Sequence, residues 1–485
     1  ENDYLTSFRP DFYDPARAGR IDPVSGNVLA NSGDRFNGII FAGQNSPYGR
    51  RVQANQYDTL GPRVGFAYNM FADGSTVLRG GFGVYYDRTL VGIVEQNAFV
   101  NPRINSRVII DNPSLDNPGA GVPRSTVPVI GLSSTGNPFE VPRTLQYSLG
   151  IQHELFHNAV LEVAYVGTSG HNLLRLININ QPVPGARAAL TQQLRANGTL
   201  TATQFPSLNA VRPFLGFGAI NDRRTEADSN YNSLQVTFNK RFSRGLQFGA
   251  VYTFSKNITD ASTDRSDSPQ DPLNPQFDRA ISQFDRTHVF TTNFLYELPI
   301  FRGRSDAVGT LLGGWQISGI YSAQSGTPLT ITQTITGATP AGSLFQFTDP
   351  LGTGSTLRPN LVGDPHGNGS VTQWFNTAAF APAFTNYGNA GRSIVRGPGI
   401  NNLDISVIKN FRFTEGTNLQ LRAEFFNALN HPQFGNPGTA ATFAPDPSAP
   451  AGSFPTRFIQ TNTSFGVINT TRDPRIIQLG VKFNY

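Results

Sequence analysis

The chain alternates apolar and polar residues with a period of two over much of its length, and this pattern constrains the fold more than any other feature. Near the start, Val64, Phe66 and Tyr68 alternate with Gly65 and Ala67. Alternation of this kind predicts β-strands with one apolar face. Eleven segments show it: 63–71, 76–86, 145–151, 161–165, 234–238, 246–254, 290–298, 315–321, 403–407, 419–425 and 477–485. The sequence therefore predicts an all-β protein.

The connections between these segments alternate strictly in length. Those within successive pairs are mostly short: 73–75, 157–158, 243–245, 414–417 and the somewhat longer 299–312. Those between pairs are long and rich in Pro, Asn, Gly and Ser: 88–143, 170–229, 257–285, 327–400 and 429–474. Short periplasmic turns, long external loops and strands of about 9–11 residues are typical of transmembrane antiparallel β-barrels. We therefore expect such a barrel, with its last strand ending on the periplasmic side.

Composition excludes several other classes of protein. The chain contains no cysteine, so it has neither a disulfide framework nor a thiolate metal site. No stretch approaches 18 consecutive apolar residues, so no transmembrane helix is predicted. A net charge of +5 without runs of Lys or Arg argues against nucleic-acid binding. Charged residues make up only 15% of the chain, which suits strands with one apolar face and one small, polar face.

Several segments resemble the TonB-dependent transporters of the bacterial outer membrane. The most telling is Phe425-Phe-Asn-Ala-Leu-Asn-His-Pro-Gln-Phe-Gly435, which is similar to the Oar-like subgroup with a carboxypeptidase-regulatory-like N-terminal domain. The terminal strand, with Phe483 and Tyr485, resembles the signal by which the barrel-assembly machinery recognises outer-membrane proteins. The further segments that carry the resemblance are 61–68, 78–86, 165–171, 231–236 and 252–256.

The resemblance implies a 22-stranded barrel in a Gram-negative outer membrane, filled by an N-terminal plug. Bacterial single-chain barrels have an even number of strands, so we expect the eleven strands to be the C-terminal half, at 61–485. Residues 1–60 then form the end of an external loop. The plug, the TonB-contacting segment and the regulatory-like domain are expected upstream. The implied function is non-enzymatic, cofactor-free, TonB-dependent uptake of an unknown solute held by the external loops. A surface anchor or adhesion protein without active transport is the alternative.

Polar residues on the non-apolar side of the strands are predicted to face the barrel lumen. A plugged barrel uses such residues more often to hold the plug than to contact substrate, and both roles remain open. The lumen candidates are Arg63, Arg79, Glu162, Gln235, Arg241, Arg422, Glu424 and Gln478.

Two other groups of residues suggest metal binding. His153-Glu154-Leu-Phe-His157 matches the H-E-x-x-H zinc motif, but it continues an alternating strand. Residues four apart on a strand lie about 13 Å apart, so we expect no zinc protease. The segment 257–285 is rich in aspartate, and a solvated external loop is the favoured interpretation of it, with Ca²⁺ binding as the alternative. The aspartates considered for this site are Asp260, Asp264, Asp267, Asp271 and Asp278.

Overall fold

The computed structural model describes most of the chain. The described residues are 5–88, 91–102, 115–117, 126–156, 158–263, 268–301, 304, 306–413, 416–448 and 457–485. His157, Asp264 and Asp267, which the sequence analysis singled out, lie outside these ranges.

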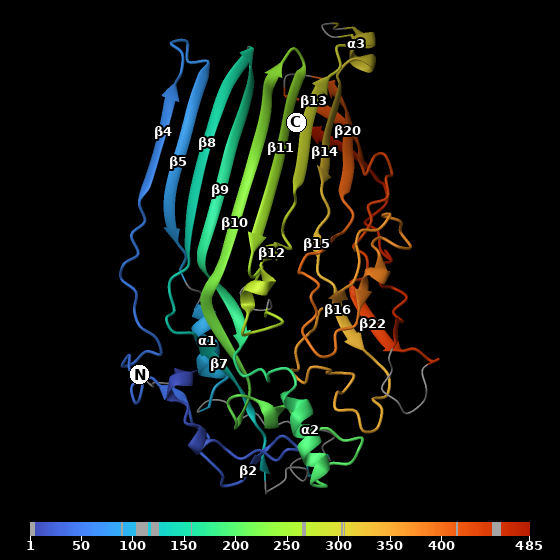
Figure 1. Cartoon of the computed structure of the whole chain (residues 1–485). Helices are drawn as coiled ribbons and strands as arrows, with labels where there is room; N and C mark the ends of the chain where they lie inside the picture. Colours follow the sequence, from blue (N-terminus) through green and yellow to red (C-terminus); the bar gives the residue numbers. More distant parts are fainter. Residues whose placement is uncertain are drawn as a thin grey trace.

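Eleven strands form one antiparallel sheet in which every strand pairs with its predecessor in this series (Figure 1). This confirms the predicted number of strands and the all-β fold class. The strands are β4 (Arg63–Asn69), β5 (Thr76–Tyr86), β8 (Arg143–Phe156), β9 (Ala159–Asn178), β10 (Phe217–Ser243), β11 (Leu246–Thr259), β13 (His288–Glu297), β14 (Trp315–Gln324), β20 (Ile400–Arg412), β21 (Asn418–Phe426) and β24 (Ile476–Asn484). Two short strands complete the sheet: β7 (Ile130–Thr135) runs parallel to β10, and β12 (Ala280–Ile281) pairs with β11.

Tight turns fix the register of the long hairpins. Between β10 and β11, Arg244 and Gly245 both have positive φ, 50° and 81°, and Ser243 pairs with Leu246. Two consecutive positive φ angles are the requirement of a type I′ turn, whose twist matches that of the flanking strands. Between β4 and β5, Asp73 Oδ1 accepts a hydrogen bond from the Ser75 backbone N–H at 3.0 Å, and Gly74 has a φ of 69°.

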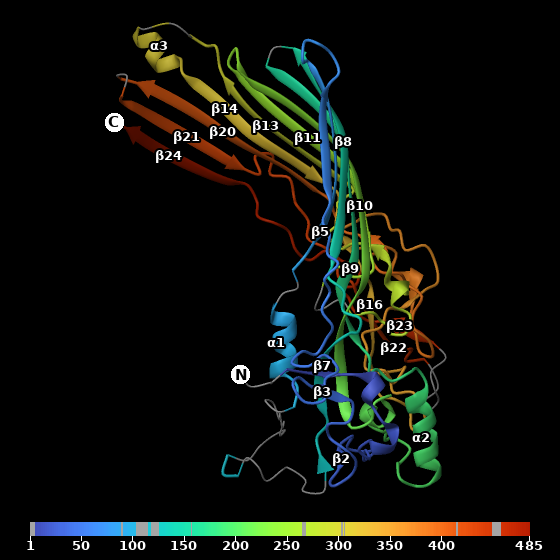
Figure 2. The same cartoon turned by 90° about the vertical axis from the view of Figure 1, so that its left-hand side faces the viewer.

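The sheet is a curved wall with two free edges. Figure 2 shows β5, β8, β9 and β10 nearly edge-on, while β14, β20, β21 and β24 extend away from them to one side. Among the described residues, β4 pairs only with β5, and β24 pairs only with β21. The C-terminus lies at the end of the sheet that carries the short turns, and the N-terminus lies at the end that carries the long connections (Figure 1).

The long connections contain regular structure of their own. They hold small sheets made of β1 (Thr6–Phe8) with β3 (Ile39–Phe41), β2 (Val28–Leu29) with β6 (Thr126–Val127), β15 (Pro328–Leu329) with β19 (Val395–Arg396), β17 (Asn360–Leu361) with β18 (Phe380–Ala381), and β16 (Thr332–Ile335) with β22 (Ala440–Pro445) and β23 (Phe458–Gln460). The α-helices are α1 (Val91–Phe99), α2 (Ala186–Ala196) and α3 (Ala307–Leu312). Short 3-10 helices span Pro10–Phe12, Pro15–Arg17, Leu208–Val211, Pro275–Asp278 and Thr377–Ala379.

The largest hydrophobic core lies in these connections rather than on the sheet. It joins the β14–β20 and β21–β24 connections, and its aromatic members include Phe347, Phe375, Phe443 and Phe465. The Phe375 and Phe465 rings pack edge to face with centroids 5.1 Å apart, a geometry that adds about 0.5–1.5 kcal/mol beyond the burial of apolar area. A second core forms around Phe8, where the N-terminal segment meets β7 and β10. The long connections therefore pack as folded bodies.

The strands β9 and β10 extend further than the alternation indicated. We expected a loop over 170–229, whereas β9 continues to Asn178 and β10 begins at Phe217. Residues 221–229 are mostly polar and charged, and the register shifts at Ala227, so no apolar period marks this ladder. Backbone pairing continues through these polar residues, and side-chain contacts such as the hydrogen bond from Arg223 Nη1 to Ser133 Oγ at 2.9 Å add to it. Alternation of apolar and polar residues reveals neither of these.

Within the described part of the chain, no helix combines the length and the apolar character needed to cross a membrane.

Candidate functional site

The register of the sheet assigns each predicted lumen residue to a face. Residues directly opposite each other in an antiparallel pair point to the same side. Ala67 of β4 lies opposite Arg79 of β5, and Arg63 is an even number of positions from Ala67 along β4. Arg63 and Arg79 therefore share a face, which continues into β8 because Arg79 lies opposite Gly150.

Three more of the predicted residues extend this face across the middle of the sheet. Gln152 is two positions beyond Gly150 on β8, and it lies opposite Glu162 of β9. Glu162 lies opposite Thr237 of β10. Gln235 and Arg241 are two and four positions from Thr237 on the same strand, so they point to the same side.

The remaining three lie near the far edge. The pairings through β11, β13 and β14 carry the same face to Ser406 of β20. Ser406 lies opposite Glu424, and Glu424 lies opposite Gln478. Arg422 is two positions from Glu424. All eight residues thus lie on one side of the sheet, which we call the polar face, but Arg63 and Arg79 are at the opposite edge from Arg422, Glu424 and Gln478.

Several side chains on the polar face contact one another: Glu424 Oε1 accepts a hydrogen bond from Ser406 Oγ at 3.2 Å, and Arg422 Nη2 donates to Gln420 Oε1 at 2.7 Å. Arg422 Nη1 lies 3.6 Å from Glu424 Oε1, and both side chains are partly exposed. Such exposed ion pairs contribute about 0–1 kcal/mol. The Arg63 guanidinium lies 4.5 Å from the centroid of the Tyr85 ring. Because the Arg422 and Glu424 side chains are still partly exposed, a partner that approaches the face can contact them.

The polar face is concave. A cavity of about 410 Å³ contains Glu162 and Arg241 together with Gln152, Asn239 and Asn293. A larger one, of about 600 Å³, lies toward the loop end and is lined by residues of β13, β14 and β20 and by residues from the start of β24 and the segment before it. The arrangement can therefore hold a polar segment or solute along its length.

Sequence reasoning missed Asn402 and Asp404, which lie on the polar face and line the larger cavity. Asp404 Oδ1 accepts hydrogen bonds from the Asn427 backbone N–H at 2.8 Å and from Asn402 Nδ2 at 2.9 Å. Asp404 lies within the alternating segment 403–407, and Asn402 lies just before it. The alternation that identified the other eight residues could therefore have identified these two.

The opposite side of the sheet is the apolar face, and its side chains are exposed. Val64 is 69% exposed, Tyr68 is 62% exposed and Leu479 is 79% exposed. Exposed apolar area on this scale marks a surface that is covered in the functional state.

His153 lies in β8, as predicted from the alternation, and its Nδ1 is 2.8 Å from Thr76 Oγ1 of the neighbouring strand β5. The strand geometry of this segment is therefore confirmed.

The described aspartates of the acidic loop are engaged with arginines and with the backbone. Asp260 Oδ1 lies 2.9 Å from Arg279 Nη1, and Asp278 Oδ1 lies 2.6 Å from Arg358 Nη1. Asp271 accepts from the Leu273 backbone N–H at 3.0 Å. Over the ranges that the structure covers, no three His, Asp or Glu side chains converge as a metal site requires. Ca²⁺ binding by Asp260, Asp264, Asp267 and Asp271 stays a prediction.

The terminal aromatic residues lie at the free edge formed by β24. Phe483 pairs with Leu419 of β21, and the Phe483 and Tyr485 rings stack with centroids 6.3 Å apart. Tyr485 is 99% exposed. Both rings are thus open to a partner at the short-turn end.

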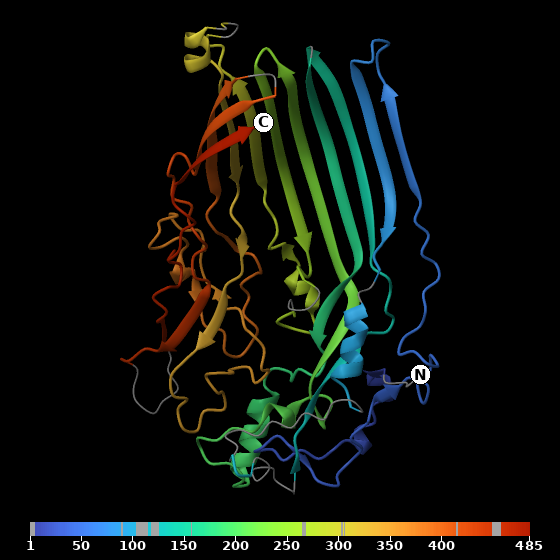
Figure 3. The ribbon, with the colours of Figure 1, turned by 180° about the vertical axis from the view of Figure 1, so that it is seen from behind.

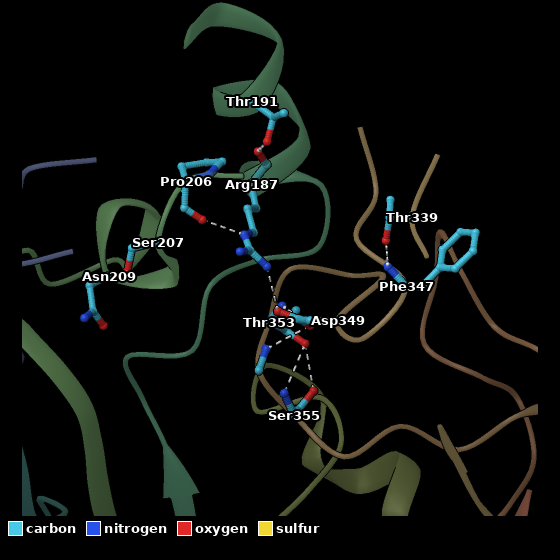
Figure 4. Close-up of polar contacts among 11 residues, drawn as sticks. Arg187, Thr191, Pro206, Ser207, Asn209, Thr339, Phe347, Asp349, Thr353 and Ser355 are labelled. Atoms are coloured by element: carbon cyan, nitrogen blue, oxygen red, sulfur yellow. Dashed lines mark hydrogen bonds and ion pairs between the residues drawn. The ribbon is translucent and has the colours of Figure 1, made fainter. Parts of the chain in front are cut away.

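An ion pair fastens two of the long connections to each other (Figure 4). Arg187 of α2 donates from Nε to the Pro206 carbonyl at 2.8 Å, and its Nη1 lies 3.5 Å from Asp349 Oδ2. Asp349 Oδ1 in turn accepts from the Thr353 backbone N–H at 3.1 Å. A Cβ on Gly352 would lie 2.5 Å from the Arg187 Cβ. Burial lowers the pKa of Arg187, which Asp349 partly offsets. We call this pair the loop latch.

Substituting Arg187→Met is expected to loosen the loop latch without disturbing the sheet. The change leaves the half-buried Asp349 carboxylate with one fewer charged partner, at a cost of about 1–3 kcal/mol. We expect limited proteolysis within 340–355 to accelerate about tenfold. Arg457→Met is the matched control, because the Arg457–Asp446 pair has an arginine that is 77% exposed. Equal cleavage rates in both variants would show that the latch contributes nothing.

Comparison with known proteins gives a family and a set of similar folds. A family model described as an outer membrane beta barrel domain matches residues 1–478. Among solved structures, the fold is similar to that of the outer membrane transporter YddB from Escherichia coli, at 10% identity and a TM-score of 0.47, over 88% of this chain and 40% of that one. No curated protein matches the sequence.

Two further similar structures are receptors. The siderophore receptor PiuA from Acinetobacter baumannii has 9% identity and a TM-score of 0.38, over 87% of this chain and 35% of that one. The ferripyoverdine receptor of Pseudomonas aeruginosa has 9% identity and a TM-score of 0.39, over 88% of this chain and 33% of that one. The chain thus spans less than half the length of each of these proteins.

Proposed function

Because this chain belongs to the outer membrane β-barrel domain family, we propose that it forms part of the wall and the external loops of a TonB-dependent receptor that imports a solute. Its location is the outer membrane. In this assignment the apolar face contacts lipid, the polar face lines the lumen, and the long connections face the outside of the cell.

The observation that carries the proposal is the separation of the two faces over all eleven strands. The polar face carries partly exposed charged side chains, and its cavities lie along the concave side. A barrel lumen that holds a plug or passes a solute needs charged and polar side chains to contact it. A sheet face without any partner has no use for them. The eight lumen candidates are proposed to contact the plug, with substrate contact as their second role.

The energy-coupling and assembly partners are proposed from the sequence resemblance. The plug and the TonB-contacting segment, with the regulatory-like domain of the Oar-like subgroup, would belong to the part of the protein that precedes residue 1. The exposed Phe483 and Tyr485 rings at the short-turn end would engage the barrel-assembly machinery. The division into an external segment at 1–60 and a barrel half at 61–485 is likewise a proposal.

A surface anchor or adhesion protein is the second candidate, and the packing of the external loops favours it. A hydrophobic core that joins two connections makes a rigid external body, which suits a protein that binds another surface. Transport and anchoring differ in their energy requirement. Solute accumulation that stops when a protonophore dissipates the proton gradient supports transport, and solute binding without accumulation supports an anchor.

Replacing residues 328–398 by a short turn is expected to abolish solute capture while the barrel still assembles. This segment supplies much of the external core. Small molecules retained from culture medium by the purified full-length protein would be compared by mass spectrometry with those retained by the variant. We expect at least a tenfold loss of the retained compound at an unchanged outer-membrane level. Undiminished retention by the shortened protein would contradict a role for this loop in capture.

A further inference from the structure

Three arginines lie at the loop end of the polar face, beside the cavity of about 600 Å³. Arg472 lines this cavity, in the segment that leads into β24. Arg286 lies two residues before β13, and Arg396 ends β19, four residues before β20. Val289 of β13 and Ile400 of β20 line the same cavity. The arginines therefore come from three different connections that the fold brings to one end of the sheet.

The three arginines are close enough for their charges to act on one another. Burial lowers the pKa of Arg286, and the charge of Asp285 partly offsets this effect. The charges of Arg396 and Arg472 lower the pKa of Arg286 further. Among the described residues, Asp285 is the only carboxylate with such an effect on Arg286. Three guanidinium groups therefore share one carboxylate.

The Asp285 carboxylate is buried and already engaged. Its Oδ1 accepts a hydrogen bond from the Asn257 backbone N–H at 2.8 Å. Its Oδ2 accepts from Thr287 Oγ1 at 3.1 Å and from Arg396 Nη2 at 2.7 Å. Arg396 also donates from Nη1 to the Gly326 carbonyl at 3.1 Å. Asp285 and Arg396 thus satisfy each other and leave the other two guanidinium groups without a carboxylate.

Arg472 is exposed and lines the cavity, so a ligand can reach its guanidinium group. Within the described part of the chain, this side chain makes neither a hydrogen bond nor an ion pair. Arg286 Nη1 donates only to the backbone carbonyl of Asp285, at 2.8 Å. Asp473 also lines the cavity but forms no ion pair with any described arginine, and Asp404 is committed to the hydrogen bonds given above. The cavity therefore offers an unpaired cation with a second one beside it.

We propose that Arg472 and Arg286 bind an oxyanion group, a carboxylate or a phosphate, at the loop end of the polar face. The forked N–H donors of a guanidinium group match the paired oxygens of such groups. The oxyanion belongs either to a solute or to an acidic side chain of the plug, and the binding chemistry is the same. Both sources rest on the proposed function, and the first names oxyanion-bearing solutes as the substrate class.

The test compares propane-1,2,3-tricarboxylate with its uncharged triamide. Titration calorimetry on the full-length protein in detergent is expected to show binding of the tricarboxylate and at least tenfold weaker binding of the triamide. Arg472→Met should weaken tricarboxylate binding at least tenfold, and Arg286→Met should weaken it several-fold. Arg475→Met is the matched control, because Arg475 lies in the same exposed segment but does not line the cavity. This variant should bind the tricarboxylate as the unaltered protein does.

Limited proteolysis distinguishes the two sources of the oxyanion. If the plug supplies it, the unaltered protein binds no tricarboxylate, and Arg472→Met, but not Arg475→Met, makes the plug at least tenfold more sensitive to protease. Four outcomes would overturn the proposal: equal binding of the two probes, tricarboxylate binding that survives Arg472→Met, equal losses in the Arg472→Met and Arg475→Met variants, or no binding together with a plug that is equally resistant in all variants.

Uptake assays separate this inference from the receptor function. Tricarboxylate binding that depends on Arg472, without uptake of any solute by cells, would leave the site in place and count against the receptor function alone. Solute uptake by a protein that neither binds the tricarboxylate nor loses plug resistance in the Arg472→Met variant would overturn the site alone.

Discussion

Arginine in place of Val236 is expected to destabilise the membrane-embedded sheet by about 2–4 kcal/mol, whereas arginine in place of its neighbour Gln235 changes stability by less than about 1 kcal/mol. Val236 lies opposite Val163 and Tyr252 on the apolar face, near the middle of the paired region. Gln235 points to the polar face. A charged side chain at the midplane must leave water for hydrocarbon in the first variant and remains in a polar lumen in the second.

The measurement is the fraction of full-length protein that is folded in outer-membrane preparations at matched expression. The two substitutions are adjacent and identical in chemistry, so each controls for the other. Equal losses would show that both faces meet the same environment and would remove the basis for a lumen. A greater loss from Gln235→Arg would reverse the assignment of the two faces.

Removing Phe483–Tyr485 is expected to lower the outer-membrane level of the protein more than tenfold. Phe483 and Asn484 end β24, which pairs with one strand among the described elements, and Phe483 and Tyr485 carry exposed aromatic rings. The truncation removes the Phe483–Leu419 pairing and the aromatic rings that we propose the assembly machinery binds.

The conservative variant Tyr485→Phe keeps the terminal aromatic ring and should assemble normally. Comparing it with the truncation distinguishes the contribution of the ring from that of the phenolic hydroxyl. Fractionation of the cell envelope followed by immunoblotting quantifies both variants. Normal membrane levels after the truncation would exclude the last three residues as an assembly signal.

The sheet could be predicted from the sequence because each of its strands is marked by a pattern within a single short segment. Segments such as Leu246–Phe254 carry their face assignment in a period of two, so both the strand and the side on which each residue lies could be predicted from sequence alone. The eight lumen candidates share a face for this reason. Their distribution over the two edges and the middle of the sheet depended on the pairing order, which alternation does not specify.

The external loops were not predictable in the same way. Phe347 and Phe375 come from segments rich in Pro, Gly and Asn without any period, and only the fold brings them beside Phe443 and Phe465. Asp222 was also not predicted to belong to a cavity. The cavity that it lines is built around β1, β7 and β10, which lie far apart in the sequence. No local pattern in the sequence shows that residues 9 and 222 line the same cavity.

The shared core of the β14–β20 and β21–β24 connections has a practical consequence for labelling this protein. Long external loops are the usual choice for inserting an epitope tag, because most of them tolerate added residues. Here an insertion next to Ile335, Phe347 or Phe443 would push apart two connections at once. The connection between β13 and β14, where α3 has no buried residue, offers a tag site that leaves this packing intact, at the end of the sheet opposite the loops (Figure 3).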